Sequence, residues 1–373
     1  MFELAQVRRQ FPELSVATYL NNAAQSLIPV QSRQAMIDTL SHRSLPGEER
    51  VSLRQQTELE TRRKIARLLN ASWEEITMVT NTSEGLNIIA QGAPLRSGDN
   101  IVVPDNEFPA NLIPWLHLKE SKGVEVKLVP SRGGFVFFED IKEYVNARTR
   151  LLALSHVGWV NGFRHTLQQI GEYCHQRGII FVVDAIQSVG ALSIDVKRCK
   201  VSALTAGGYK WLLSPCGTGF LYLDQALLGS IKLTYLSYLS ISTEPEDFCF
   251  QIDLRPDSSR FKLGSVNDVG IAAMEKSLEL ILYLGIEHIE SHLLHLTDLL
   301  AEELQKRGYR IISHLDPSHR SSILTFEAKG DAAELYQKLV DNQIIASLRG
   351  GGLRVSPHFY NSEEDIARLL EFL

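Results

Sequence analysis

The run IIFVVDA, residues 179–185, decides how this chain folds. It is rich in β-branched and aromatic side chains and has no polar residue before its aspartate. A strand of this kind is buried on both faces, as in a parallel sheet covered by helices. Similar runs occur on both sides of it: ITMVT (76–80), NIVVP (100–104), VEVKLVP (124–130), RLLALSH (150–156) and GFLYL (219–223). Amphipathic stretches lie between them, at 56–69, 84–92, 109–121 and 165–177. This alternation predicts a doubly wound α/β domain.

After residue 268 the pattern changes. Long helical patterns cover 268–284 and 286–307, and the tail then reads as RIISH (310–314), SILTF (322–326), a helix at 331–341, LRVSP (353–357) and a helix at 362–372. This order predicts a smaller α+β domain. We expect residues 16–267 to form the large domain, and residues 1–15 to pack with 268–373 in the small one.

Composition excludes several classes of protein. The net charge is −6 and the isoelectric point is about 6.0, so the basic surface of a nucleic-acid binder is missing. No apolar stretch approaches the roughly 18 residues of a membrane helix, and the first residues lack the core of a signal peptide. The four cysteines form no CxxC pair. We therefore expect a cytoplasmic metabolic enzyme that binds neither nucleic acid nor membrane.

Two charged residues near the ends of apolar runs point to one kind of chemistry. Asp184 ends its run, and a buried carboxylate there needs a cationic partner. Lys210, in TAGGYKWLLSPCGTGF (205–220), has apolar neighbours that favour the neutral, nucleophilic amine needed for a Schiff base. Pyridoxal phosphate enzymes use such a lysine beside an aspartate that holds the pyridinium nitrogen, and Gln187 could donate to the phenolate oxygen. Considered alone, Lys210 could also be an ordinary lysine whose amine reaches solvent. Asp184 alone could be the N-cap of a helix.

A phosphate site is predicted where a helix begins after the run at 76–80. In TNTSEGLN (80–87), Thr82 and Ser83 offer hydroxyl groups beside the free amides of a helix start. The same residues also fit an ordinary capping box. Phe108, in NEFPANLIPW (106–115), could stack on a flat heteroaromatic ring or serve as a core aromatic.

The order of eight blocks along the chain resembles the class V aminotransferase family of pyridoxal phosphate enzymes. The blocks are YLNNAA (19–24), TSEGLN (82–87), NEFPANLIPW (106–115), SHVGWVNG (155–162), VVDAIQ (182–187), GGYKW (207–211), RFKLGSVN (260–267) and LRVSPHFYNSEED (353–365). The chain is most similar to the branch with cysteine desulfurases, selenocysteine lyases, isopenicillin N epimerases and kynureninases. The resemblance implies fold type I: a large, mostly parallel seven-stranded sheet domain and a smaller C-terminal domain.

The resemblance also implies roles for individual residues. Lys210 would form the aldimine with pyridoxal 5′-phosphate and then move the proton at Cα. The other implied cofactor contacts are Asp184 at the ring nitrogen, Gln187 at the phenolate oxygen, Phe108 on the ring, and Thr82, Ser83 and Tyr209 at the phosphate. Ser265 would reach the phosphate of the neighbouring subunit, which implies a homodimer. Arg354 would bind the substrate α-carboxylate through a bidentate fork, and Asn22 would also lie at the substrate.

This chain departs from the family pattern at the site. Phe108 stands where desulfurases have histidine, Trp159 where many relatives have asparagine, and Gly207 where many have serine. Desulfurases also carry a cysteine loop before the carboxylate-binding arginine. Here SLRGGGLRVSP (347–357) has no cysteine, and the nearest preceding one is Cys249. Because persulfide formation needs a thiolate, the sequence argues against a desulfurase. Arg349 is either a second anion contact or part of a solvated turn, and the three glycines favour the turn.

These observations lead us to expect a pyridoxal phosphate enzyme that acts at Cα of a small amino acid, first of all an aminotransferase. A Cβ–S lyase of the cysteine or selenocysteine type, a kynureninase-like hydrolase and an amino-acid epimerase share every residue named and stay open. A non-catalytic scaffold of the same fold is disfavoured, because Lys210, Asp184 and Arg354 are all present. No metal is expected: His288, His292 and His295 share a helix face but lack the glutamate of the zinc-protease pattern.

Overall fold

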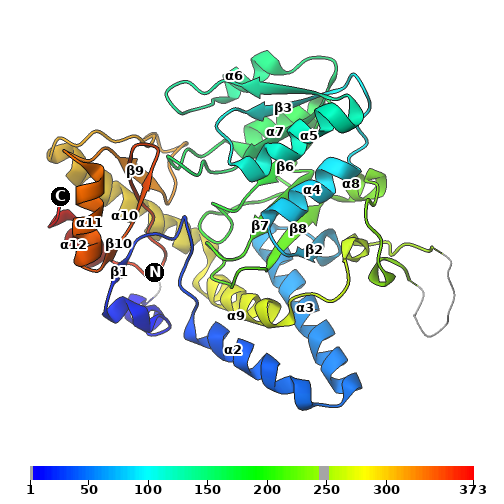
Figure 1. The fold of residues 1–373 in the computed structure, drawn as a ribbon, viewed down its shortest axis with the longest axis horizontal. Coiled ribbons are helices and arrows are strands. Elements are labelled where there is room, and N and C mark those ends of the chain that lie inside the picture. Colours follow the sequence, from blue (N-terminus) through cyan, green and yellow to red (C-terminus); the bar gives the residue numbers. More distant parts are fainter. Residues whose placement is uncertain (1–2, 243–251) are drawn as a thin grey trace.

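The computed structural model describes residues 3–242 and 252–373. At its centre is a seven-stranded sheet in the order β2-β8-β7-β6-β5-β3-β4 (Figure 1). The strands are β2 (Ile76–Val79), β3 (Asn100–Pro104), β4 (Glu125–Val129), β5 (Thr149–Ser155), β6 (Ile180–Asp184), β7 (Ala203–Gly207) and β8 (Gly219–Leu223). The predicted fold class, a mostly parallel seven-stranded sheet, is confirmed.

Among these seven strands, β8 runs against the others. It pairs antiparallel with both β2 and β7, whereas the pairs from β7 across to β4 are all parallel. The carboxyl ends of the other six strands therefore meet at one edge of the sheet, which is where such sheets bind ligands. The chain passes Lys210 in the loop that turns from β7 back into β8.

Each face of the sheet has its own hydrophobic core, because successive side chains of a strand point to opposite faces. Ile101 and Leu151 belong to the core under α4, α5 and α8. Their neighbours Val102 and Leu152 belong to the core that α3, α7 and α9 share. The helices around the sheet are α2 (Val30–Ser41), α3 (Gly47–Leu69), α4 (Thr82–Gly92), α5 (Ile113–Lys122), α6 (Phe138–Tyr144), α7 (Leu167–Gln176), α8 (Gln225–Ser230) and α9 (Asp268–Leu284).

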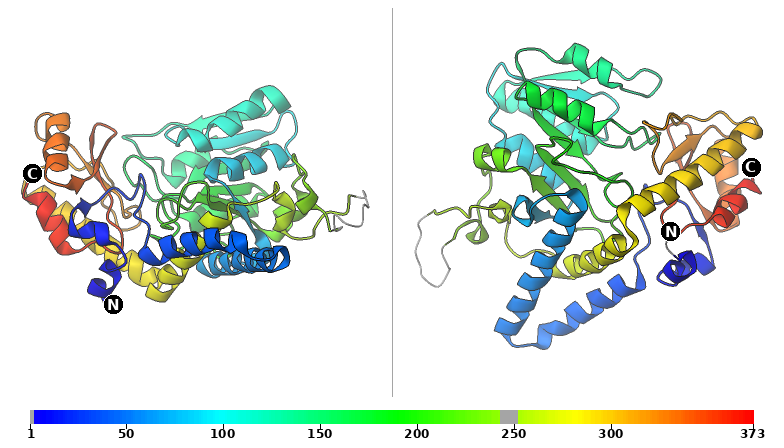
Figure 2. Two further views of the ribbon diagram at one scale, coloured as in Figure 1. Left: turned by 60° about the horizontal axis from the view of Figure 1, so that its bottom comes forward. Right: turned by 180° about the vertical axis from the view of Figure 1, so that it is seen from behind.

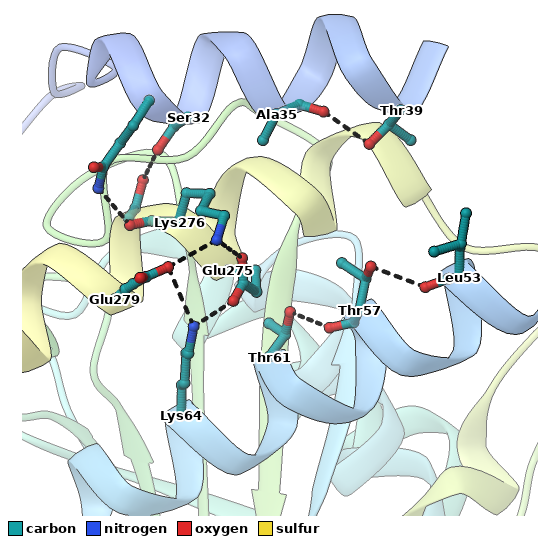
Figure 3. A network of polar contacts seen from close by, with 12 residues as sticks. Ser32, Ala35, Thr39, Leu53, Thr57, Thr61, Lys64, Glu275, Lys276 and Glu279 are labelled. Atoms are coloured by element: carbon teal, nitrogen blue, oxygen red, sulfur yellow. Dashed lines mark hydrogen bonds and ion pairs between the residues drawn. The ribbon is translucent and has the colours of Figure 1, made fainter. Parts of the chain in front are cut away.

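Helix α9 packs between α2 and α3, and polar contacts join the three helices (Figure 3). Lys64 of α3 forms an ion pair with Glu275 and lies 3.6 Å from the carboxylate of Glu279, both on α9. On the other side of α9, the hydroxyls of Ser32 and Ser277 share a hydrogen bond of 2.8 Å. The Lys64 contacts hold α3 against α9, and the Ser32–Ser277 hydrogen bond holds α2 against α9.

A second, smaller group of elements is built from both ends of the chain. It contains α1 (Leu4–Arg8), β1 (Thr18–Tyr19), α10 (Ile286–Lys306), β9 (Leu324–Phe326), α11 (Ala332–Asp341), β10 (Ile344–Ile345), β11 (Ser347–Arg349), β12 (Gly352–Val355) and α12 (Glu363–Leu370). Strand β1 pairs parallel with β10, and β11-β12-β9 form an antiparallel sheet. Arg8 forms an ion pair of 2.7 Å with Asp365. Leu300, Phe326 and Leu353 lie in a separate core of this group.

Figure 2 shows that the run of α9 and α10 connects this group with the large sheet. The expected division at 16–267 and 1–15 plus 268–373 stays a prediction. Within the described ranges, no helix combines the length and apolar character needed to cross a bilayer. Cys249 lies outside the described residues.

The expected strand RIISH (310–314) is the main local difference from the sequence prediction. Only Ile311 forms a bridge there, with Phe326. The amides of Ile312 and Ser313 both donate to the carbonyl of Thr325, at 2.8 and 3.1 Å. Because two successive amides share one acceptor, a regular ladder cannot continue.

Candidate active site

A cavity opens at the carboxyl edge of the large sheet, beside Lys210. Seven of the predicted site residues line it: Thr82, Ser83, Phe108, Asp184, Gln187, Tyr209 and Lys210. They come from four separate segments of the chain, and the sheet topology brings them together. Asn81, Ser155 and Trp159 complete the polar and aromatic part of the wall.

Lys210 lies where its ammonium form loses its proton more easily than that of a lysine in water, with a pKa of about 8. Burial lowers the pKa of its side chain, and the charges of Arg354 and Arg349 lower it further, while Asp184 acts in the opposite direction. The ammonium lies 5.7 Å from the centre of the Tyr209 ring. A lysine with a lowered pKa can attack a carbonyl carbon at neutral pH.

Asp184 is a buried carboxylate that lacks an ion pair among the described residues. Its side chain is 2% exposed, and Oδ1 accepts a hydrogen bond of 2.9 Å from the amide of Ile186. Burial raises its pKa, and the charge of Lys210 opposes this. No Lys, Arg or His of the described segments lies within 4.0 Å of it. A buried carboxylate without a partner suits a protonated ring nitrogen.

The N-terminus of α4 faces the same cavity. Asn81 caps the helix by accepting from the amide of Glu84 at 3.0 Å, so the amides of Thr82 and Ser83 stay free of intrahelical partners. The hydroxyl of Thr82 accepts from the amide of Gly207 at 2.9 Å, which ties α4 to the end of β7. A Cβ at Gly85 would lie 2.2 Å from the hydroxyl of Thr205, so only glycine allows this approach. The free amides fit a phosphate group.

The amide of Gln187 is locked in one orientation. Its Nε2 donates to the carbonyl of Ala23 at 2.9 Å, and its Oε1 accepts from Nε1 of Trp211 at 3.0 Å. One hydrogen of Nε2 is left for the cavity. Because Trp211 directly follows Lys210, the same contacts position the lysine. Together with Asp184 and the α4 terminus, Gln187 fits a bound pyridoxal phosphate.

Arg354, on β12, approaches the cavity from the smaller group of elements. Its side chain is 2% exposed, and its Nη1 donates to the carbonyl of Trp159 at 2.5 Å. Its buried Nε has no hydrogen-bond partner, and within the described ranges no carboxylate pairs with it. Trp159 packs edge-on against Phe108 at 5.5 Å between ring centres. A buried, unpaired guanidinium suits a substrate carboxylate.

Three predicted residues are not part of the cavity wall: Arg354, which contacts the wall residue Trp159, and Ser265 and Asn22. Ser265 is exposed and lines a different hollow, with Gly217 and Asn267. Asn22 is fully buried: its Nδ2 donates to the carbonyl of Ser356 at 2.8 Å, and its Oδ1 accepts from the hydroxyl of Tyr360. Both polar ends of Asn22 are thus used within the protein.

Glu107, a candidate from sequence because it follows the run at 100–104, is a buried carboxylate behind the cavity wall. Glu107 accepts from the amide and the hydroxyl of Ser155 at 2.6 and 2.5 Å, and from Nδ2 of Asn111 at 3.0 Å. Burial raises its pKa to about 7. Glu107, Asn111 and Trp115 are spaced by four residues, and Nε1 of Trp115 donates to Oδ1 of Asn111 at 3.1 Å.

The three histidines on α10 each have a partner of their own, and Nδ1 of His288 lies 3.3 Å from the carbonyl oxygen of Leu284. His292 shares a hydrogen bond with the carbonyl of Asn361 at 2.9 Å, and His295 pairs with Glu363 at 2.7 Å. Across the described part of the chain, no cluster of three or more His, Cys, Asp or Glu side chains suits a metal ion.

Comparisons with known proteins cover almost the whole chain. The sequence profile of the aminotransferase class-V family matches residues 18–369. A probable cysteine desulfurase of Methanothermobacter thermautotrophicus is 30% identical, over 98% of this chain and 96% of its own. An uncharacterized aminotransferase of Schizosaccharomyces pombe is 31% identical, over 84% of this chain and 81% of its own. The apo structure of a cysteine desulfurase from Thermococcus onnurineus superposes with a TM-score of 0.90 at 24% identity, covering 100% and 97% of the two chains.

Proposed function

The chain belongs to the class V aminotransferase family and is a pyridoxal phosphate-dependent enzyme, and from this premise we propose that it is an aminotransferase for a small amino acid. When bound, pyridoxal phosphate supplies the electron withdrawal that makes the Cα proton of the substrate acidic. Lys210 holds the cofactor covalently before the substrate arrives and afterwards moves the proton at Cα. Arg354 binds the substrate α-carboxylate.

The remaining residues orient these groups. Asp184 keeps the ring nitrogen protonated through a charge-assisted hydrogen bond. Gln187 donates its free amide hydrogen to the phenolate oxygen, while Trp211 and Ala23 keep its side chain in place. The amides of Thr82 and Ser83 bind the phosphate, and Phe108 covers the ring.

The observation that carries the proposal is the hairpin before Arg354, which holds no thiol. Strands β11 and β12 are joined directly through Gly350 and Gly351. Cys174 and Cys199 are buried and their pKa values are raised by burial, so they do not supply a thiolate at this site. Transamination needs no protein nucleophile beyond Lys210.

One spectroscopic experiment tests the aminotransferase proposal. Purified holoenzyme receives single amino acids without a keto acid, while its visible absorption is followed. We expect a lasting conversion to the pyridoxamine form with one equivalent of keto acid released, and reversal when a keto acid is added. Release of sulfide, alanine or a D-amino acid with return of the starting spectrum would instead assign a lyase, a kynureninase-like hydrolase or an epimerase. No cofactor band after incubation with pyridoxal phosphate would support the scaffold alternative.

The relatives named as cysteine desulfurases favour a second candidate, a Cβ–S lyase. Without a thiol in the β11–β12 hairpin, this enzyme would break the Cβ–S bond of cysteine by elimination and release sulfide to solvent, with pyruvate and ammonia as the other products. Sulfide released from L-cysteine at a rate independent of alkylation of Cys216, the exposed cysteine among the described residues, would establish this candidate.

The position of Ser265 supports a homodimer. The serine lies outside its own cavity, on an exposed segment, and we propose that it reaches the phosphate bound by the partner subunit. Sedimentation should give twice the chain mass of 41.9 kDa, and Ser265→Ala should weaken cofactor binding without dissociating the dimer.

A further inference from the structure

The antiparallel pairing of β11 with β12 places two arginines on one face. Ser347 lies opposite Arg354, and Arg349 lies opposite Gly352. Directly opposed residues of an antiparallel pair point to the same face, and so do residues two apart on one strand. Ser347, Arg349 and Arg354 therefore share a face, with Arg349 and Arg354 as diagonal neighbours.

This face contacts the loop of Trp159, which lines the cavity. Arg354 donates to the carbonyl of Trp159, and Thr325, opposite Arg354 on β9, donates to the carbonyl of Val160 at 2.7 Å. The hairpin turn is in contact with the same loop, since a Cβ at Gly350 would lie 2.3 Å from Cγ1 of Val160. The loop that holds Trp159 in the cavity wall thus holds the hairpin as well.

The β11–β12 hairpin carries more positive charge than the ligand groups assigned so far would use. The positive charges of Arg349 and Arg354 both lower the pKa of Lys210, and that of Arg349 also lowers the pKa of Arg354. Among the described residues Arg349 has no acidic partner, and its Nη1 donates only to the carbonyl of Leu348. The cofactor phosphate is assigned to the N-terminus of α4 and the substrate α-carboxylate to Arg354, so Arg349 is left without an assigned partner.

Three buried polar atoms around the hairpin also lack partners: Nε of Arg354, Oγ of Ser347 and Nε1 of Trp159. All three can donate hydrogen bonds. Buried donors without acceptors are uncommon in folded proteins, so this group indicates a ligand that presents several oxygen atoms.

We propose that the amino acid bound here carries a second anionic group, which Arg349 binds while Arg354 binds the α-carboxylate. The substrate class is an acidic amino acid, with a carboxylate, sulfinate or similar oxyanion on its side chain. The unpaired hydroxyl of Ser347 and the indole of Trp159 donate to the remaining oxygens. This inference rests on the proposed function, because it assigns the side chain of the same substrate.

The test compares two ligands of equal size on the holoenzyme. Succinate carries two carboxylates, and succinamate replaces one of them with an amide. Their dissociation constants are measured by isothermal titration calorimetry at low ionic strength. Wild-type protein should bind succinate about fivefold more tightly, the upper range for an ion pair that water can reach.

Variants of one residue locate the effect. Arg349→Gln should bind succinate and succinamate equally, and Arg349→Lys should keep most of the preference for succinate. Arg310 is an exposed arginine elsewhere in the small group. Arg310→Gln should leave the preference for succinate unchanged. Steady-state kcat/KM for L-aspartate against L-asparagine should follow the same order. Because Arg349 is on the surface, its variants are expected to fold.

The possible results distinguish failure of the second-anion proposal from failure of the aminotransferase proposal. If the holoenzyme transaminates neutral amino acids yet binds succinate and succinamate equally, the second-anion proposal is overturned and the aminotransferase proposal stands. An unchanged preference in Arg349→Gln overturns it in the same way. If no amino acid alters the cofactor's absorption, both proposals fall.

Discussion

Replacing Arg354 with glutamine should make the apoprotein more stable while it weakens substrate binding. Burial, and then repulsion by Arg349, lower the pKa of Arg354 to about 10, more than two units below its usual value. At pH 7 the side chain is charged in both the folded and the unfolded chain, since this pH lies below both values. One pKa unit is worth about 1.4 kcal/mol, so keeping this charge costs the folded state about 3 kcal/mol.

The glutamine keeps a donor for the carbonyl of Trp159 but loses part of the packing of the aliphatic stem, worth about 1 kcal/mol. The net gain in the free energy of unfolding for Arg354→Gln is therefore about 2 kcal/mol. Urea denaturation of the apoprotein at pH 7, monitored by tryptophan fluorescence, measures it. In the holoenzyme, the same variant should bind a neutral amino acid about 100-fold more weakly, because a charge-assisted fork is lost.

Arg62 provides the matched control. It is as buried as Arg354, but its Nη2 lies 3.1 Å from the carboxylate of Asp257. Arg62→Gln breaks a buried ion pair and should lower the free energy of unfolding by about 3 kcal/mol. If Arg354→Gln is destabilised as much as Arg62→Gln and binds substrate normally, the reasoning about an unpaired, ligand-directed charge is refuted.

The other predictions concern the lysine, a titrating core residue and a helix contact. Lys210→Ala should bind pyridoxal phosphate without a borohydride-reducible bond, so a reducible adduct on that variant, detected by mass spectrometry, would disprove the assignment. The raised pKa of Glu107 means that the folded state binds its proton more tightly than the unfolded one, so stability is lost as pH rises from about 4.5 to about 7. Thermal unfolding of apo wild type and Glu107→Gln at pH 5 and pH 8 should show this loss only in the wild type, and equal pH dependence would contradict it. Gly171→Ala should cost more than about 3 kcal/mol, because its Cβ would lie 1.8 Å from the carbonyl oxygen of Cys199. Gly229→Ala, in open space, should be neutral or slightly stabilising in the same chemical denaturation assay.

The sequence predicted the sheet well because its strands are buried on both faces. The ends of NIVVP and GFLYL match β3 and β8. Strand β7 was not visible as an apolar run, since Ala203–Gly207 is made mostly of small residues. It is held in the sheet by its neighbours and by the close approach of Gly85 to Thr205, which are properties of the tertiary structure.

Site residues that follow the ends of strands could be predicted from the sequence. Those whose position depends on how two strands are paired could not. Asp184 and Lys210 lie beside the ends of neighbouring strands, so topology alone brings them together. Arg349 was expected in a solvated turn, yet it lies in β11, and the turn begins at Gly350. Its nearness to Arg354 depends on which residues of β11 and β12 are paired, and the sequence pattern does not contain this information.

The pairing of β1 with β10 joins residues 18–19 to residues 344–345. During synthesis the early strand has no partner until residue 345 has left the ribosome, while every strand of the large sheet is complete by residue 223. The sheet that holds Lys210 and Asp184 can therefore form first on the growing chain. Arg354, on β12, follows the last strand of the large sheet by more than a hundred residues, so a nascent chain acquires Lys210 and Asp184 well before it has the arginine assigned to the substrate.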